Sequence, residues 1–301
     1  MMDPAVSFEP HRRRLLGLAY RMLGSVSEAE DAVQDTYLRW HGTDRDVVSD
    51  VRAFLTTTTT RICLDTLKSA RARREAYVGP WLPEPVLDTV ALAPDTQTEL
   101  AEDLSIALLL ALDRLSALER AAFLLHDVFD CSFSEVASAL GRSAAACRQL
   151  ASRARTHVRE ARPQGALTDR DRSEPSNHGR LVSAFVNAAR SGDLQTLMGL
   201  LADDVRLTTD GGGKVVAATN VIEGAERTAR FVVGAVSKGL PEGSIIRMAP
   251  INGLPGLIVY RPDGSVQSVA FEIEHNLVRA IYAVSNPEKL SHLSSGVRKT
   301  V

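Results

Sequence analysis

Side chains that could bind nucleic acid are concentrated in residues 141–162, which contain six arginines and a single acid. Helical spacing places them on neighbouring lines of one helix face. Such side chains hydrogen-bond base edges and phosphates in the major groove of DNA. The candidate DNA contacts on this face are Arg148, Gln149, Ser152, Arg153 and Arg155. A helical hairpin with a solvated arginine face is the alternative interpretation.

The elements that would position these arginines are two short helices joined at a glycine. Ser132 and Glu135 have the spacing of a capping box, so a helix is expected to begin near Phe133. Gly141 should end that helix, and Ser143 can cap the next one. An apolar stripe opposite the arginines would pack on the first helix: Cys147, Leu150, Ala151, Ala154 and Val158. The pattern predicts a helix-turn-helix.

The 301 residues are enough for two or three domains, and the net charge is −2. This charge is unevenly distributed: residues 52–75 hold six bases and two acids, whereas residues 81–105 hold six acids and no base. The longest apolar run, residues 106–112, is too short to span a bilayer, so we expect a cytoplasmic protein without a membrane partner. Cys63, Cys131 and Cys147 lack metal-site spacing and are expected to be buried thiols.

The N-terminal region reads as three helices. A helix over residues 12–24 precedes one that starts at a second capping box, Ser27 to Glu30. The outer face of the latter carries Asp31, Gln34, Asp35 and Leu38, for which ordinary solvation and a docking surface both remain open. We expect the third helix despite five consecutive threonines, Thr56 to Thr60, which by propensity favour a strand. It carries the cations Arg61, Lys68, Arg71, Arg73 and Arg74, which could bind a nucleic-acid backbone.

A proline-rich stretch, residues 79–99, is expected to be an extended linker, and a second linker is expected at residues 163–176. Residues 177–301 then predict two helices, a strand at 205–209, a turn, a strand at 215–219 and a third helix. Four alternating strand patterns follow at residues 244–249, 257–261, 266–273 and 277–284. Helices followed by a run of strands indicate an α+β domain.

Enzymatic proton abstraction in that domain would need a carboxylate base and a neutral acid facing a pocket. The candidates are Asp210, Glu272, Glu274 and His275. Glu272 and Glu274 alternate with Phe271 and Ile273 along a strand, so both carboxylates are expected on a solvated face. Asp210 belongs to a predicted hairpin turn. We therefore expect a regulatory or ligand-sensing domain, with no catalytic residue, metal or cofactor.

Three stretches follow one another along the chain: AEDAVQDTYLRW, VRAFLTTTTTRICLDTLKSARARR and the segment from LDRLSALER to RTHVRE. Together and in this order they resemble the extracytoplasmic-function sigma factors of bacterial RNA polymerase. The resemblance implies one all-α domain at residues 1–78 that binds the polymerase clamp and the minus-ten element. It implies another, containing the helix-turn-helix, at residues 100–162 that binds the minus-thirty-five element. Asp31, Gln34, Asp35 and Leu38 would then face the clamp.

The C-terminal pattern resembles a SnoaL-like, ketosteroid-isomerase-type cone, and the whole chain resembles the SigJ-type subgroup in which this domain is fused to a sigma factor. Three motifs carry that likeness: WLPEP (Trp81, Leu82, Pro83, Glu84, Pro85), DGGGK (Asp210, Gly211, Gly212, Gly213, Lys214) and NPEKL (Asn286, Pro287, Glu288, Lys289, Leu290). The likeness implies core RNA polymerase and promoter DNA as partners, and control in cis without a separate anti-sigma factor. Whether the C-terminal domain also binds a small molecule is left open.

The linker is expected to bind the C-terminal domain, because a tryptophan between prolines exposes apolar area unless something covers it. Specifically, WLPEP would pack against the DGGGK turn with Glu84 paired to Lys214, and burial of Trp81 would supply most of the hold. Packing of Trp81 on the N-terminal domain is the alternative. Two other classes of protein also remain open: a one-component helix-turn-helix regulator, and a SnoaL-like enzyme with a DNA-binding appendage.

Overall fold

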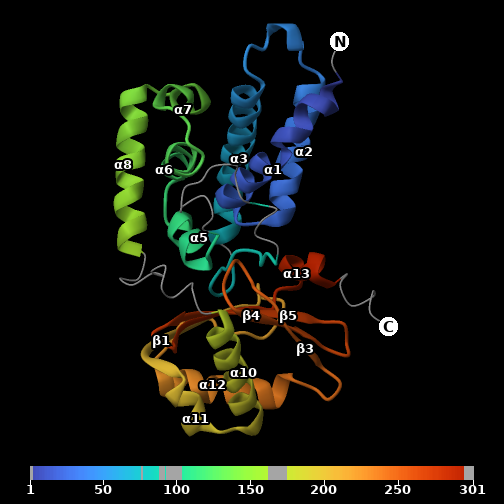
Figure 1. The fold of residues 1–301 in the computed structure, drawn as a ribbon, viewed down its shortest axis with the longest axis vertical. Coiled ribbons are helices and arrows are strands. Elements are labelled where there is room, and N and C mark those ends of the chain that lie inside the picture. The colour runs from blue at the N-terminus through green and yellow to red at the C-terminus, as the bar shows by residue number, and fades with distance from the viewer. Residues whose placement is uncertain (1–2, 76, 88–91, 93–103, 162–174, 295–301) are drawn as a thin grey trace. The chain divides into compact units, whose positions relative to one another are not determined.

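The structure is a computed structural model that describes residues 3–75, 77–87, 92, 104–161 and 175–294 (Figure 1). The chain divides into two compact units. One combines Met1–Ala76 with Asp88–Pro163, and the other combines Tyr77–Leu87 with Gln164–Val301. The segment that contains WLPEP therefore belongs to the C-terminal unit, although it lies between the two helical regions in the sequence.

The first helical region contains α1 (Pro4–Leu23), α2 (Val26–His41), the short η1 (Arg45–Val47) and α3 (Val51–Glu75). Gly24 ends α1 with a left-handed φ of 71°. The predicted start of α2 at Ser27 was wrong, because the side chain of Ser25 accepts the hydrogen bond from the N–H of Glu28 and caps the helix two residues earlier. Ala29, Val33 and Trp40 lie on the face of α2 opposite Asp31 and Asp35 and are buried in the core.

The threonine run lies within α3, as predicted. Thr60 donates its hydroxyl to the carbonyl of Thr56 one turn earlier, at 2.8 Å. Thr36 of α2 and Thr59 of α3 join their buried hydroxyls at 2.9 Å. Because these hydroxyl groups are satisfied inside the packed helices, tertiary packing overrides the strand propensity of the threonines.

The second helical region contains α5 (Ile106–Asp113), α6 (Ala117–Phe123), the π-helical turn η3 (Leu124–Val128), α7 (Phe133–Leu140) and α8 (Ala144–Ala161). The capping box at Ser132 and Glu135 is confirmed in both directions, and Gly141 ends α7 with a φ of 62°. The apolar stripe of α8 is buried at Cys147, Ala151, Ala154 and Val158. The predicted helix-turn-helix is present as α7 and α8.

Arginines hold the two helical regions of this unit together. Arg14 of α1 donates to the carbonyl of Phe129 at 2.5 Å, and Arg120 of α6 donates to the carbonyl of Met22 at 2.5 Å. Both arginines are buried. Their charge is thus compensated by backbone carbonyls and, for Arg120, by the carboxylate of Asp113 at 3.0 Å.

The C-terminal unit is an α+β structure with one curved, six-stranded sheet in the order β2-β1-β6-β5-β4-β3. Its strands are β1 (Leu201–Asp210), β2 (Ile222–Glu223), β3 (Ile245–Met248), β4 (Gly256–Tyr260), β5 (Val266–Glu274) and β6 (Leu277–Val284). Its helices are α10 (Pro175–Ser191), α11 (Leu194–Gly199), α12 (Ala225–Gly239) and α13 (Pro287–Ser294). The β1–β6 pair is parallel, whereas the other pairs are antiparallel.

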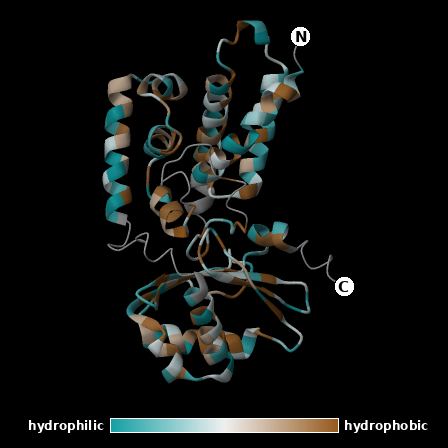
Figure 2. Ribbon diagram, in the orientation of Figure 1, coloured by the Kyte–Doolittle hydropathy of each residue, from teal (hydrophilic) through white to brown (hydrophobic). Residues whose placement is uncertain are grey.

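Helices α10, α11 and α12 cover one face of this sheet, and α13 lies over the opposite face (Figure 1). The apolar core forms between the sheet and the first three helices, around Phe185, Leu207, Phe271 and Ile281. Figure 2 shows hydrophobic and hydrophilic residues interspersed along these strands and helices. The four late strands agree with the predicted ones to within two residues at each end.

The strand predicted at residues 215–219 does not form. After Asp210 the chain turns back, since Gly212 and Gly213 both take positive φ values and the N–H groups of Lys214 and Val215 bond to the carbonyl of Gly211. The chain is then attached to β1 by a side chain, because the hydroxyl of Thr209 bonds both the N–H and the carbonyl of Ala218. The apolar segment VVAAT therefore forms a loop rather than a strand.

Candidate nucleic-acid interface and linker-binding site

Helix α8 presents a basic face to solvent. Arg148, Gln149, Ser152 and Arg153 are exposed, as the helical spacing predicts, while the opposite stripe is buried. The guanidinium of Arg148 lies over the ring of Phe133 at 5.3 Å from its centre. Arg153 lies within 3.3 Å of Glu119 through an exposed side chain. Because solvent screens both contacts, these residues keep the freedom to contact DNA.

Arg155 differs from its neighbours on α8. Its Nε donates to Asp127 at 2.7 Å, and the Asp127 carboxylate is largely buried. Arg155 is itself half-buried, so this pair joins α8 to the turn that precedes α7. The geometry assigns Arg155 to holding the helix in place, although the sequence pattern grouped it with the candidate DNA contacts.

The cations of α3 fall into two groups. Arg61 donates to the carbonyls of Ser138 and Ala139, at 2.9 and 3.1 Å, and so contacts the C-terminal turn of α7. Lys68 is exposed and pairs with Asp65 at 2.8 Å. Arg71, Arg73 and Arg74 lie in the last turns of α3, and their side chains are outside the described residues. Any contact of Arg61 with DNA therefore requires it to leave α7.

The acidic face of α2 is available to a partner. Asp31, Gln34, Asp35 and Leu38 are all exposed, and Leu38 keeps 59% of its surface accessible. On the opposite side of α2, Trp40 is buried and donates its indole N–H to the carbonyl of Pro4 and the hydroxyl of Ser7. Trp40 is thus a core residue.

The linker residues 77–87 are bound by a buried carboxylate of the same unit. Asp210, the last residue of β1, accepts hydrogen bonds from the Tyr77 hydroxyl at 2.5 Å and from the Leu82 N–H at 2.8 Å. Burial, together with the neighbouring Asp210, raises the pKa of Tyr77 above its ordinary value, so the hydroxyl stays protonated and donates. One carboxylate therefore fixes both ends of a six-residue stretch of linker, Tyr77 to Leu82.

Lys289 completes this site from α13. Its ammonium group bonds the second carboxylate oxygen of Asp210 at 2.7 Å and the carbonyl of Leu82 at 2.5 Å. The same nitrogen lies 4.9 Å from the ring centre of Tyr77 and 4.4 Å from that of Trp81, which gives cation–π contacts. The motifs WLPEP, DGGGK and NPEKL therefore meet around one ion pair.

The glycines of DGGGK allow this close approach. A Cβ on Gly212 would overlap the side-chain amide of Asn286, and one on Gly213 would lie 3.1 Å from the Cβ of Val78. Asn286 in turn donates to the Tyr77 hydroxyl at 2.9 Å, and its N–H bonds the carbonyl of Asp210. The glycine-rich turn thus lets the side chains of Asn286 and Val78 approach the backbone closely.

One detail of the predicted contact was wrong. Lys214 pairs with Glu288 of the NPEKL motif, and the expected Glu84–Lys214 pair does not form. Trp81 is partly buried, whereas the residues from Leu82 to Val86 are all buried, and Leu82 is completely inaccessible. Leu82 therefore adds fully buried apolar area beside that of Trp81.

Further linker contacts come from residues that the sequence did not single out. Asn252 has a left-handed backbone and is buried; its side-chain carbonyl accepts the N–H of Val86 at 3.1 Å. Its own N–H donates to the carbonyl of Val86 at 2.8 Å. His292 of α13 bonds the carbonyl of Pro85 at 2.9 Å. Tyr77, Asn252 and His292 are separated widely in sequence, so no local pattern could have joined them.

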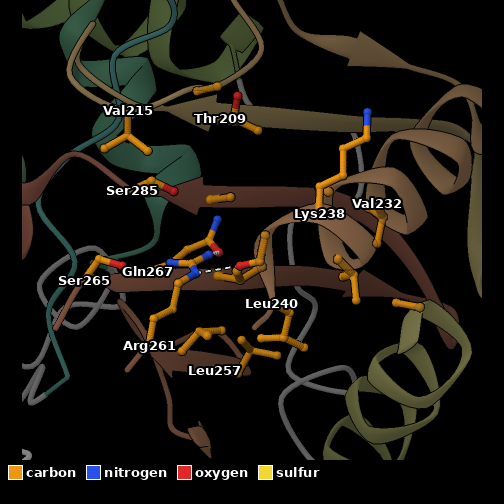
Figure 3. A pocket seen from close by; sticks show the side chains of 18 of the residues that line it. Thr209, Val215, Val232, Lys238, Leu240, Leu257, Arg261, Ser265, Gln267 and Ser285 are labelled. Atoms are coloured by element: carbon orange, nitrogen blue, oxygen red, sulfur yellow. Dashed lines mark hydrogen bonds between the residues drawn. The ribbon is translucent and has the colours of Figure 1, made fainter. Parts of the chain in front are cut away.

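A cavity of about 990 Å³ lies between the sheet and helices α10 and α12 (Figure 3). Among its described lining residues there is no Asp210, Glu272, Glu274 or His275. Glu272 is on the other face of the sheet and accepts the Tyr282 hydroxyl at 2.9 Å, so its expected solvation was wrong. Glu274 pairs with Arg279 at 3.1 Å. The four candidates for acid–base catalysis are thus outside the cavity.

The three cysteines are free and buried, as predicted. Within the ranges that the structure describes, no cluster of histidine, cysteine and acidic residues could hold a metal ion. In the same ranges, no helix combines the length and the apolar character needed to cross a bilayer.

Comparisons with known proteins agree on one family. Residues 8–73 match the model for sigma-70 region 2, and residues 105–158 match the model for sigma-70 region 4. The ECF RNA polymerase sigma factor SigJ of Mycobacterium tuberculosis is 40% identical over 94% of this chain and 92% of its own length. The probable ECF sigma factor SigI of the same species is 30% identical over 97% of this chain and 96% of its own.

A solved structure extends the likeness to the fold. The crystal structure of M. tuberculosis SigJ superposes with a TM-score of 0.71 at 35% identity, covering 95% of this chain and 98% of that chain.

Proposed function

Because this chain belongs to the extracytoplasmic-function sigma factors, which direct RNA polymerase to promoters, we propose that its SnoaL-like unit controls this activity in cis by holding the linker. The protein is a transcription initiation factor and not an enzyme. The observation that carries the proposal is the docking of residues 77–87 on Asp210 and Lys289. This linker joins region 2 to region 4, so holding it limits how far the two promoter-binding regions can separate once their direct contacts, such as Arg14 to Phe129, are broken.

The contacts of residues 77–87 are suited to reversible binding of the linker by the C-terminal unit. The polar contacts use one buried ion pair and several backbone groups, and the apolar contribution comes from a few side chains such as Leu82. Burial of one leucine contributes about 1.5–3 kcal/mol, which is comparable with the energy of an allosteric coupling. A regulator bound to the same chain needs no second protein, so we further propose that no separate anti-sigma factor is required.

Contacts with the two partners follow from the exposed faces. We assign the polymerase contact to Asp31, Gln34, Asp35 and Leu38 of α2, supported by their exposure on one face. We assign the upstream promoter contact to Arg148, Gln149, Ser152 and Arg153 of α8. The proposed contacts to opened DNA on α3 are Arg61, Lys68, Arg71, Arg73 and Arg74, with Arg61 first released from α7.

We propose a segmentation into a domain at residues 1–78, a linker at 79–99, a domain at 100–162, a linker at 163–176 and a domain at 177–301, with Tyr77 and Val78 packed on the last of these. In this proposal the first linker acts as part of the C-terminal domain, because residues 77–87 pack with it.

In vitro transcription with core polymerase tests the proposal. Asp210→Ala removes the acceptor of Leu82 and Tyr77, so promoter output should change at least about twofold, which corresponds to roughly 0.4 kcal/mol of coupling. Asp203→Ala, an exposed acid of the same strand, is the matched control and should leave output unchanged. Core-polymerase affinity measured alongside should be equal in all three proteins. Equal output from Asp210→Ala and wild type would refute control through the linker.

A further inference from the structure

The cavity of the C-terminal unit has an apolar body. Its volume, about 990 Å³, is at the upper end of the range for small-molecule sites. Strands contribute Leu207, Leu257, Val259, Val269, Phe271 and Ile281, and α12 contributes Phe231 and Val232 on the opposite side. A cavity lined in this way accepts an extended hydrocarbon or fused-ring body.

One end of the cavity is polar. The guanidinium of Arg261 is fixed there, since its Nε donates to the carbonyl of Gly239 at 2.7 Å and its Nη2 to the side-chain carbonyl of Gln267 at 2.8 Å (Figure 3). Among the described residues, no acceptor bonds its Nη1. Ser265 and Gln267 lie beside it (Figure 3). A preorganised guanidinium with free donors recognises a carboxylate.

The charge of the lining favours an anion. Its cations are Arg190, Arg230, Lys238 and Arg261, and the single acid among the described lining residues is Asp263. The carboxylate of Asp263 is engaged by the N–H of Ser265 at 2.8 Å. Arg230 is paired with Glu226 at 2.7 Å. Asp263 offsets one further cation, so the lining keeps an excess of two positive charges. A ligand with one negative group would offset part of this excess.

We propose that this cavity binds a small amphipathic acid, with its carboxylate on Arg261 and its apolar body between α12 and the sheet. The ligand is bound and not transformed, because the carboxylates of Glu272 and Glu274 are on other parts of the unit. The single acid of the lining, Asp263, is an exposed turn residue whose carboxylate accepts the N–H of Ser265.

The position of the cavity connects it to the linker. Thr209 and Ser285 line the cavity, and each directly precedes a residue of the linker-binding site, Asp210 and Asn286. The loop after the DGGGK turn also forms part of its rim through Val215 and Val216, which are exposed apolar residues. We infer that occupancy of the cavity alters the hold on the linker. This second part rests on the proposed function, whereas the binding site itself does not.

Equilibrium dialysis of the full chain with labelled dodecanoate, kept below its micellar concentration, tests the site. Dodecanoate should bind saturably, and 1-dodecanol, which has the same chain with a neutral head, should bind at least about tenfold more weakly. Arg261→Gln should weaken dodecanoate binding by a similar factor. Arg247→Gln, an exposed arginine of β3 outside the lining, is the matched control and should bind as wild type does.

Arg261 also bonds the end of α12, so its replacement could disturb the fold. Val269→Trp is the second variant: it fills the cavity from the middle of the sheet and should abolish binding while circular dichroism stays unchanged. Absence of saturable dodecanoate binding to the wild-type chain overturns the site. Equal affinity for dodecanol and dodecanoate overturns the carboxylate assignment.

Linker coupling has its own readout. The difference in fluorescence between the full chain and Trp81→Phe isolates Trp81, and dodecanoate should shift this difference spectrum. If dodecanoate binds saturably but leaves the Trp81 difference spectrum unchanged, the coupling to the linker is refuted and the binding site is not. A failure of the proposed function is recognised separately, because Asp210→Ala would then leave promoter output unchanged with or without ligand.

Discussion

Asp210 and Lys289 form a buried ion pair 2.7 Å long between the end of β1 and helix α13, and the linker lies directly on it. The Asp210 side chain is inaccessible to solvent and that of Lys289 is 10% exposed. Burying two charges is costly unless further hydrogen bonds satisfy them. Here Tyr77, Leu82 and the aromatic rings supply those contacts, so the pair is fully compensated only while the linker is docked.

Removal of the cation should release the linker. Lys289→Met keeps much of the side-chain volume but leaves Asp210 as an uncompensated buried charge, which typically costs about 3–5 kcal/mol. Detachment of residues 77–87 costs less free energy than keeping this charge buried. We therefore expect faster proteolysis in this segment and a red shift of Trp81 emission. Arg247→Met, which replaces an exposed cation of β3 outside the cavity lining, is the control. An unchanged cleavage pattern in Lys289→Met would contradict the proposed hold.

Gly212→Ala should have a similar effect through sterics. Its φ is +61°, a conformation that costs an alanine about 1–2 kcal/mol, and the added Cβ would overlap the Asn286 amide. Gly179→Ala in α10 is the matched control, because a Cβ there meets nothing within 4 Å and a helical glycine is about 0.5–1 kcal/mol worse than alanine. Chemical unfolding of the full chain should therefore shift in opposite directions for the two variants.

Two arginines of α8 should separate DNA contact from helix support. Arg148→Ala should weaken binding to the upstream promoter element by about 1–3 kcal/mol and relax specificity at one base pair, if it makes a bidentate base contact. Arg155→Ala should instead lower stability, because it leaves the largely buried Asp127 carboxylate without its partner. Binding of promoter variants and thermal unfolding, measured on the same proteins, distinguish the two. Identical behaviour would mean that α8 is not the base-contacting helix.

Phosphate contacts on α3 have a different signature. Arg73→Ala or Arg74→Ala should weaken DNA binding uniformly across sequences and lower the slope of log affinity against log salt by about one unit. The slope is obtained from the DNA affinity of the polymerase complex, measured at several salt concentrations. An unchanged slope in both variants would remove these residues from the DNA interface.

The start of α7 should be sensitive to acid. Glu135 accepts hydrogen bonds from the hydroxyl and the N–H of Ser132, and these bonds lower the pKa of its carboxyl. A lowered pKa in the folded state means that the contribution of Glu135 is complete above the unfolded value, near 4.5, and is lost as the pH falls through the folded value. Amide protection at the first turn of α7 should therefore decline with acid in that window, and Glu135→Gln should flatten the decline.

The sequence by itself determined the local elements and the two arginine-bearing regions. Capping at Ser132, the glycine stop at Gly141 and the apolar stripe of α8 are set by neighbours within a few turns, so spacing was sufficient to predict them. The late strands followed from alternation and turn residues in the same way. The motifs shared with the family indicated which distant segments are functionally important, but not which of their side chains contact one another.

Only the tertiary structure decided which groups pair. Lys214 was expected on Glu84 and lies on Glu288, Arg155 was grouped with DNA contacts and holds Asp127, and Glu272 was expected in water and lies against Tyr282. Each of these outcomes depends on side chains brought together from remote positions, and the cost of burial selects the partner. The loop at residues 215–219 has the same origin, since the hydroxyl of Thr209 bonds the backbone of Ala218 within a segment that was predicted to be a strand.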